Sequence, residues 1–143
     1  MFTKLTDSVW VSAQITVADV AQAAAQGITL IVNNRPEDES ADQTPGEAIA
    51  AAAAAAGLAY VAIPVGHGGF SEPQVAALGK ALAEAPGPVL AYCRSGTRST
   101  LLWSLAQAAQ GHDPETLALQ AARAGYDISP VRQLVDMLAA KAG

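Results

Sequence analysis

Short apolar runs alternate with longer helical segments along the chain, and this alternation restricts the possible folds more than any other feature. Extended segments are expected at residues 8–14, 28–33, 59–63 and 89–92. The run ITLIVN at 28–33 is apolar and β-branched almost throughout, which is typical of a strand buried on both faces. Strands separated by helices predict an α/β fold with a mostly parallel central sheet flanked by helices.

Cap signals delimit the expected helices. Ser71 and Gln74 form a capping-box pattern, and each of the pairs Asp113-Pro114 and Ser129-Pro130 places proline directly after an N-cap residue. Glycine follows several of the segments, at the position where helices commonly end. The helices are expected at residues 17–26, 47–56, 72–84, 100–110, 114–124 and 130–142.

Length and composition exclude several classes of protein. A chain of 143 residues has the usual size of one domain, so residues 1–143 are expected to form a single domain. A net charge of −5 without a basic run argues against nucleic-acid partners. No run is long enough to span a membrane, and the first residues lack the apolar core of a secretory signal. The lone Cys93 excludes an internal disulfide and suits a reducing compartment, so we expect a cytoplasmic protein with neither metal nor other cofactor.

The run CRSGTRS at residues 93–99 carries the chemistry. A loop that leaves a buried strand and enters a helix points several backbone N–H groups at one place, and the helix N-terminus adds a positive field. This arrangement predicts an anion site and favours the thiolate of Cys93, the nucleophilic form. Gly96 lets the loop curl, and the guanidinium fork of Arg98 fits tetrahedral oxyanions. We therefore predict Cys93 and Arg98 as catalytic residues, with anion contacts from Arg94, Ser95, Gly96, Thr97 and Ser99.

Each of these residues also has a simpler interpretation. A lone cysteine after an apolar strand is commonly an inert buried side chain, but two nearby arginines favour a reactive one. Arg35 follows the strand at 28–33, on the same sheet edge as the cysteine loop, and is predicted to be a second anion contact oriented by Glu39. The alternative for this tract is a solvated acidic loop. His67 lies between glycines and is a candidate proton donor or lid residue, although an exposed loop histidine is equally compatible.

The loop CRSGTRS resembles the active-site loops of rhodanese sulfurtransferases and of cysteine-dependent phosphatases. Together with the runs VSAQ, NNRPEDE, GLAY and IPV, it makes residues 1–125 similar to the beta-lactamase hydrolase-like, phosphatase-like domain family, whose members are often labelled sulfur transferases. The resemblance implies an α/β fold of the dual-specificity-phosphatase type. It leaves the reaction open.

Loop length and the missing acid bear on the reaction. Phosphatases of this type carry Cys-x5-Arg, often after a histidine, and usually an aspartic acid on an earlier loop that protonates the leaving group. This chain has Cys-x4-Arg after Tyr92, and the run VGHGGF holds His67 but no aspartate. We therefore expect an enzyme that transfers sulfane sulfur through a Cys93 persulfide, with thiosulfate or a small persulfide as anionic donor. The alternatives are a phosphatase that hydrolyses phosphate monoesters through a phospho-cysteine, with His67 or Glu72 as acid, and a non-catalytic anion-binding module.

Overall fold

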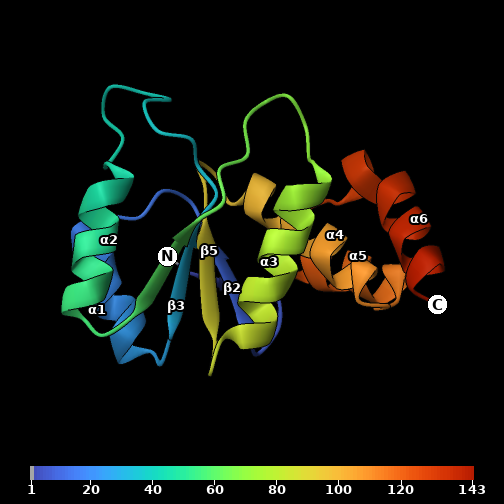
Figure 1. Cartoon of the computed structure of the whole chain (residues 1–143), viewed down its shortest axis with the longest axis horizontal. Coiled ribbons are helices and arrows are strands. Elements are labelled where there is room, and N and C mark those ends of the chain that lie inside the picture. The colour runs from blue at the N-terminus through green and yellow to red at the C-terminus, as the bar shows by residue number, and fades with distance from the viewer. Residues whose placement is uncertain (1) are drawn as a thin grey trace.

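A computed structural model describes residues 2–143, and its centre is one five-stranded sheet with the strand order β1-β2-β5-β3-β4. The four longer strands run parallel, and only the two-residue edge strand β1 is antiparallel to its neighbour. Figure 1 shows the sheet between two groups of helices. The predicted mostly parallel α/β fold is confirmed. The strands are β1 (Thr3–Lys4), β2 (Val9–Ser12), β3 (Leu30–Asn33), β4 (Ala59–Ala62) and β5 (Val89–Tyr92).

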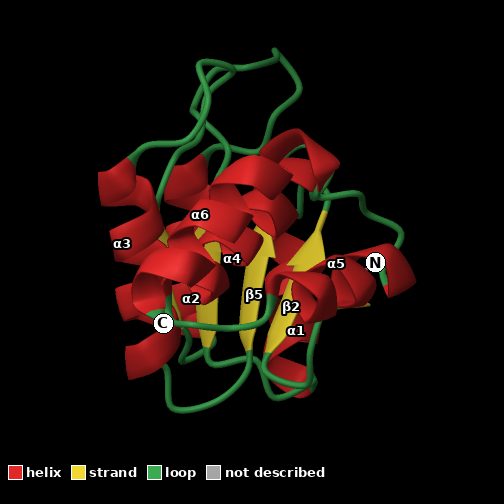
Figure 2. Cartoon of the chain, turned by 90° about the vertical axis from the view of Figure 1, so that its right-hand side faces the viewer, coloured by secondary structure: helices red, strands yellow, loops and turns green. Residues whose placement is uncertain are grey.

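Side chains of β5 alternate between the two faces of the sheet and so divide the core in two. Leu90 and Tyr92 pack with α1 and α2, whereas Val89 and Ala91 pack with the helices of the other face. In Figure 2, α4 and α6 lie in front of the strands. The helices are α1 (Val17–Ala25), α2 (Gly46–Ala55), α3 (Glu72–Glu84), α4 (Thr97–Ala109), α5 (Pro114–Arg123) and α6 (Arg132–Ala142), with a short 3-10 turn η1 (Ser129–Val131) before α6.

The helix α4 starts three residues earlier than expected. Gly96 occupies its N-cap position in the left-handed region, with φ 90°, so the chain turns into the helix directly after the loop. Arg98 and Ser99 consequently belong to the first turn of α4. The capping box of Ser71 and Gln74 and the N-cap role of Asp113 are confirmed.

The predicted start of the last helix, at residue 130, was wrong by two residues. Asp127 accepts hydrogen bonds from both the backbone N–H and the hydroxyl of Ser129. Ser129–Val131 form the 3-10 turn, and α6 begins only at Arg132, so Ser129 is not the N-cap of the last helix as predicted. No helix within residues 2–143 is long and apolar enough to cross a membrane.

The parallel order brings the ends of β2, β3, β4 and β5 to one edge of the sheet. The loops that follow β3 and β4 rise above this edge in Figure 1, and the cysteine loop follows β5 between them. Backbone hydrogen bonds continue past the strands here, from Cys93 N–H to the Ser12 carbonyl and from Asn34 N–H to the Tyr92 carbonyl. The candidate site therefore stands on the rigid centre of the sheet.

Candidate active site

Cys93 is fully buried directly after β5, and the loop that follows it curls back over its sulfur. The backbone N–H of Gly96 donates to Sγ of Cys93 at 3.1 Å. The first turn of α4 begins one residue later, so the positive end of the helix adds to the field at the sulfur. Both features favour a negative charge on Cys93 or on an anion bound beside it.

Arg98 uses one end of its guanidinium to hold neighbouring loops. Its Nη1 and Nη2 donate to the two carboxylate oxygens of Glu39 at 2.7 and 2.9 Å, and Nη1 also donates to the Val65 carbonyl at 2.7 Å. A guanidinium has five N–H groups, and these contacts take three. The other two N–H groups, on Nε and Nη2, form a parallel pair that can hold two oxygens of one anion. Arg98 also has a side-chain hydrogen bond with Cys93.

Cys93 and Arg98 interact electrostatically. The hydrogen bonds that Arg98 donates to Glu39 are the main cause that raises its pKa, and the negative charge of Cys93 and a side-chain hydrogen bond with Cys93 raise it further. The guanidinium is therefore a permanent cation beside the sulfur. Its position is fixed by Glu39 and Val65 before any anion arrives.

Arg35 contacts Glu39 and is buried from solvent. Its side chain is only 4% exposed. Its Nε donates to Glu39 at 2.9 Å, Nη1 donates to Gln14 at 3.0 Å, and Nη2 donates to the Ser40 hydroxyl at 3.2 Å. Arg35 and Glu39 thus pair as expected, and the arginine holds the carboxylate that in turn holds Arg98. A direct contact between Arg35 and an anion stays a prediction.

Glu39 is the centre of this network, and sequence reasoning gave it only an orienting part. Hydrogen bonding from Arg98, opposed by burial and reinforced by Arg35, lowers the pKa of Glu39 from 4.5 to about 2. The carboxylate is therefore ionised at any physiological pH. The only local signal for it was an arginine four residues earlier in an otherwise acidic tract.

Replacement of Glu39 by glutamine should therefore destabilise the protein near neutral pH but not in acid. A carboxylate whose pKa is lowered in the folded state contributes stability above its unfolded-state pKa of 4.5, and this contribution is lost as the pH falls through about 2. The shift corresponds to roughly 3 kcal/mol. Urea unfolding of the parent and Glu39→Gln should differ by about this amount near neutral pH and converge in acid. Glu84→Gln, on the exposed end of α3, is the matched control, and a Glu39→Gln difference independent of pH would contradict the assignment.

His67 lies at the rim of the same network. Its side chain is 89% exposed, and its Nε2 is 3.9 Å from a carboxylate oxygen of Glu39. The loop that carries it also supplies the Val65 carbonyl to Arg98. Glu72 is exposed in the first turn of α3. The structure thus brings His67 to the site edge, and its catalytic role stays a prediction.

The remaining loop residues differ in what they offer. Arg94, Ser95 and Thr97 are exposed, and the Ser95 hydroxyl donates to Oγ1 of Thr97 at 3.1 Å. The Ser99 hydroxyl is buried and donates to the side-chain carbonyl of Asn34 at 2.8 Å. Only the backbone N–H of Ser99 is therefore left to face an anion.

Sequence reasoning missed two neighbours of the loop. Gln14 donates its backbone N–H to the Arg94 carbonyl at 3.3 Å, and the Tyr126 hydroxyl donates to the Ser95 carbonyl at 3.2 Å. Gln14 appeared only within a quoted motif. Nothing near Tyr126 in the sequence marks it as a neighbour of the cysteine loop.

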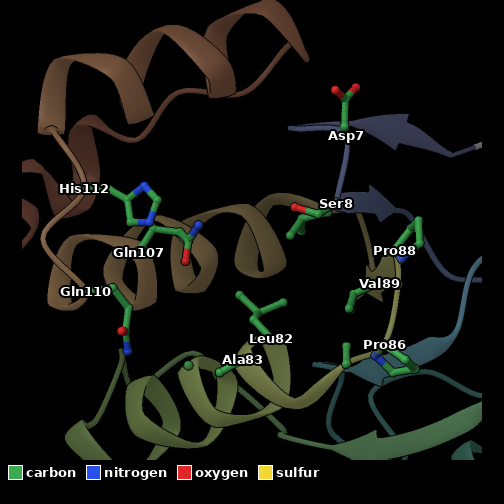
Figure 3. A pocket seen from close by; sticks show the side chains of 14 residues that line it. Asp7, Ser8, Leu82, Ala83, Pro86, Pro88, Val89, Gln107, Gln110 and His112 are labelled. Atoms are coloured by element: carbon green, nitrogen blue, oxygen red, sulfur yellow. The ribbon is translucent and has the colours of Figure 1, made fainter.

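A hollow lies at the other end of the sheet. It has a volume of about 620 Å³ and lies between α3, α4 and the beginnings of β2 and β5. Leu82, Val89, Gln107 and His112 are among the side chains around it in Figure 3. Cys93 follows the opposite end of β5, so this hollow does not belong to the cysteine site.

Comparisons with known proteins show the family of this chain. The family model described as "Beta-lactamase hydrolase-like protein, phosphatase-like domain" matches residues 1–110. The Beta-lactamase hydrolase-like protein of Agrobacterium fabrum (strain C58) is 35% identical over 108 residues, which are 76% of this chain and 25% of that protein. A protein of the same name from Xylella fastidiosa (strain Temecula1) is 36% identical over 101 residues, 71% of this chain and 23% of that protein. The chain thus spans about a quarter of the length of these curated relatives.

Solved structures show the same fold. A candidate phosphatase from Neisseria meningitidis Z2491 is 33% identical, with a TM-score of 0.83 over 95% of this chain and 96% of that chain. TpbA from P. aeruginosa, crystallised in complex with phosphotyrosine, is 18% identical, with a TM-score of 0.67 over 99% of this chain and 89% of that chain. The phosphatase type of α/β fold is confirmed by these neighbours.

Proposed function

Because the chain belongs to the family of the phosphatase-like domain of beta-lactamase hydrolase-like proteins, we propose that it is a cysteine-dependent phosphatase acting on phosphate monoesters. The observation that carries the proposal is the pairing of Cys93, under the Gly96 N–H, with an Arg98 guanidinium that keeps two parallel donors for an anion. The relatives support this reaction better than sulfur transfer, which was our leading expectation and which these comparisons do not support.

The reaction would proceed in two steps. The Cys93 thiolate attacks phosphorus, an S–P bond forms, and the bond between phosphorus and the ester oxygen breaks. The leaving oxygen needs a proton, and His67 at the rim is the candidate donor. Glu39 is unsuited to this role because its pKa of about 2 keeps it ionised and bound to the arginines. Water then attacks the phospho-cysteine, which releases phosphate and restores the thiolate.

Arg98 would stabilise the charge of the transferring phosphoryl group. Its contacts with Glu39 and Val65 take one end of the guanidinium and leave the Nε and Nη2 donors for two phosphoryl oxygens. Because the ion pair fixes the side chain in advance, little reorganisation is needed during the reaction. The exposed Arg94 would attract anionic substrates to the rim.

Sulfur transfer remains the second candidate because the loop is one residue shorter than the Cys-x5-Arg loop of phosphatases. In that reaction the thiolate would take the outer sulfur of thiosulfate and release sulfite, and cyanide would then remove the sulfur as thiocyanate. The same cradle of N–H groups and arginine could hold thiosulfate, which is also a small anion.

A side-by-side assay separates these functions. The protein is given p-nitrophenyl phosphate in one arm, and thiosulfate with cyanide in the other. We expect release of p-nitrophenol and phosphate in equal amounts, with thiocyanate no higher than in the protein-free blank. Thiocyanate without phosphate release would overturn the proposal in favour of sulfur transfer. Absence of both products would leave the non-catalytic anion-binding module.

A further inference from the structure

Tyr126 contacts the cysteine loop from a part of the chain outside the family match, which ends at residue 110. It lies in the turn between α5 and η1. Its position is fixed on both sides, because its backbone N–H donates to the Ala121 carbonyl at 2.9 Å and Ile128 is buried in the core. Its ring covers Gly96 so closely that a Cβ at that position would collide with the Tyr126 hydroxyl.

The hydroxyl and the nucleophile contact opposite sides of one peptide unit. The Ser95 carbonyl accepts from the Tyr126 hydroxyl at 3.2 Å, and the N–H of the same peptide, on Gly96, donates to Sγ of Cys93 at 3.1 Å. In a trans peptide the carbonyl and the N–H point in opposite directions. A donor that holds the carbonyl outward therefore also holds the N–H inward, toward the sulfur.

We propose that Tyr126 is a positioning residue for the cysteine loop: its hydroxyl locks the Ser95–Gly96 peptide so that the Gly96 N–H stays aimed at Cys93 and at the bound phosphoryl group. The part that concerns the phosphoryl group rests on the proposed function. The part that concerns Cys93 rests on the geometry of the loop alone.

The loop needs such a lock because its sequence permits the peptide to rotate. Gly96 has the broad backbone freedom of glycine, and the Ser95 side chain is exposed and is hydrogen-bonded only to Thr97, two residues along the same loop, in the part of the chain that the structure describes. A rotated peptide would turn its carbonyl oxygen toward the thiolate, so that a negative dipole end would replace a donor. Burial raises the pKa of Tyr126, and the charge of Cys93 raises it further, so the hydroxyl keeps its proton and remains a donor.

Tyr126→Phe tests the proposal because it removes only the hydroxyl. We expect kcat/KM for p-nitrophenyl phosphate to fall about tenfold, the effect of losing one well-placed hydrogen bond. The pH midpoint of Cys93 alkylation should rise by roughly half a pH unit, because the thiolate loses part of its N–H donor. The melting temperature should stay close to that of the parent. Tyr60→Phe is the matched control: its hydroxyl accepts from Asn33, its ring packs on the opposite face of the sheet from Tyr126, and neither readout should change.

The two readouts separate the inference from the proposed function. If the parent shows no phosphatase turnover but the alkylation midpoint still rises in Tyr126→Phe, the positioning role of Tyr126 is supported and the proposed reaction is wrong. An unchanged alkylation midpoint in Tyr126→Phe would overturn the lock, whether turnover is retained or falls together with the melting temperature, since those results indicate an inert contact or a merely structural one.

Discussion

Cys93→Ser is expected to lower the hydrolysis of p-nitrophenyl phosphate by at least roughly 10³-fold. The serine hydroxyl has nearly the same size and can still accept the Gly96 N–H, so the loop should keep its shape. A hydroxyl is far less ionised than a thiol at neutral pH and cannot attack phosphorus without a base to activate it. Binding of inorganic phosphate should therefore survive when turnover is lost. Steady-state kinetics and calorimetric titration with phosphate measure the two properties.

The chain offers a matched control for this prediction, because Cys93 is its only cysteine. Ser104 is fully buried in α4 and donates to the Leu101 carbonyl, seven residues after the first residue of the helix. Adding Ser104→Cys to Cys93→Ser supplies a thiol outside the cradle and should restore no activity. Turnover by Cys93→Ser within tenfold of the parent would show that Cys93 is not the nucleophile.

Arg98→Lys is expected to lower kcat/KM by about 10²-fold or more, although the charge is kept. A single ammonium group cannot hold the Glu39 carboxylate and the Val65 carbonyl and also give two parallel donors to a phosphoryl group. The rate of Cys93 alkylation at each pH should stay close to that of the parent in this variant, since the loop N–H groups, the helix end and a cation are all still present. Turnover and the pH dependence of alkylation, measured on the same preparations, check both statements.

Two further variants serve as comparisons for Arg98→Lys. Arg98→Ala removes the cation and should weaken both turnover and thiolate formation. Arg132→Lys alters an arginine paired with Glu115 and Asp136 on the far helices and should change neither. If Arg98→Lys turned over substrate as fast as the parent, the anion would be held by backbone N–H groups and Arg94, and the proposed role of Arg98 would be wrong.

Local patterns in the sequence were sufficient for most of the fold. Strands such as β3 and β5 are short apolar runs, and capping residues such as Ser71 act on backbone groups three residues away. The edge strand β1 was missed because two residues carry no periodic signal. The start of α4 was misplaced because the left-handed conformation of Gly96, which begins the helix early, depends on how the loop closes.

The site was predictable only where its parts adjoin in sequence. Residues 93–99 are consecutive, in the loop after β5 and the first turn of α4, and their residue types indicate an anion site without any knowledge of the fold. The contact between Arg98 and Glu39 joins positions 59 residues apart, and that between Tyr126 and Ser95 joins positions 31 apart. The topology of the fold brings such pairs together, so no local spacing in the sequence predicts them. Sulfur transfer was expected from the short loop and the missing aspartic acid, and the family and the solved relatives favour the other alternative.

The nature of the covalent intermediate tests the central claim most directly. The protein is mixed with p-nitrophenyl phosphate, quenched rapidly during turnover and measured by intact mass, with a parallel sample mixed with thiosulfate. A phospho-cysteine mechanism predicts a gain of one phosphoryl group in the first sample, located on the peptide that contains Cys93 and absent from Cys93→Ser. A gain of one sulfur atom in the second sample, with no phosphoryl adduct in the first, would contradict it.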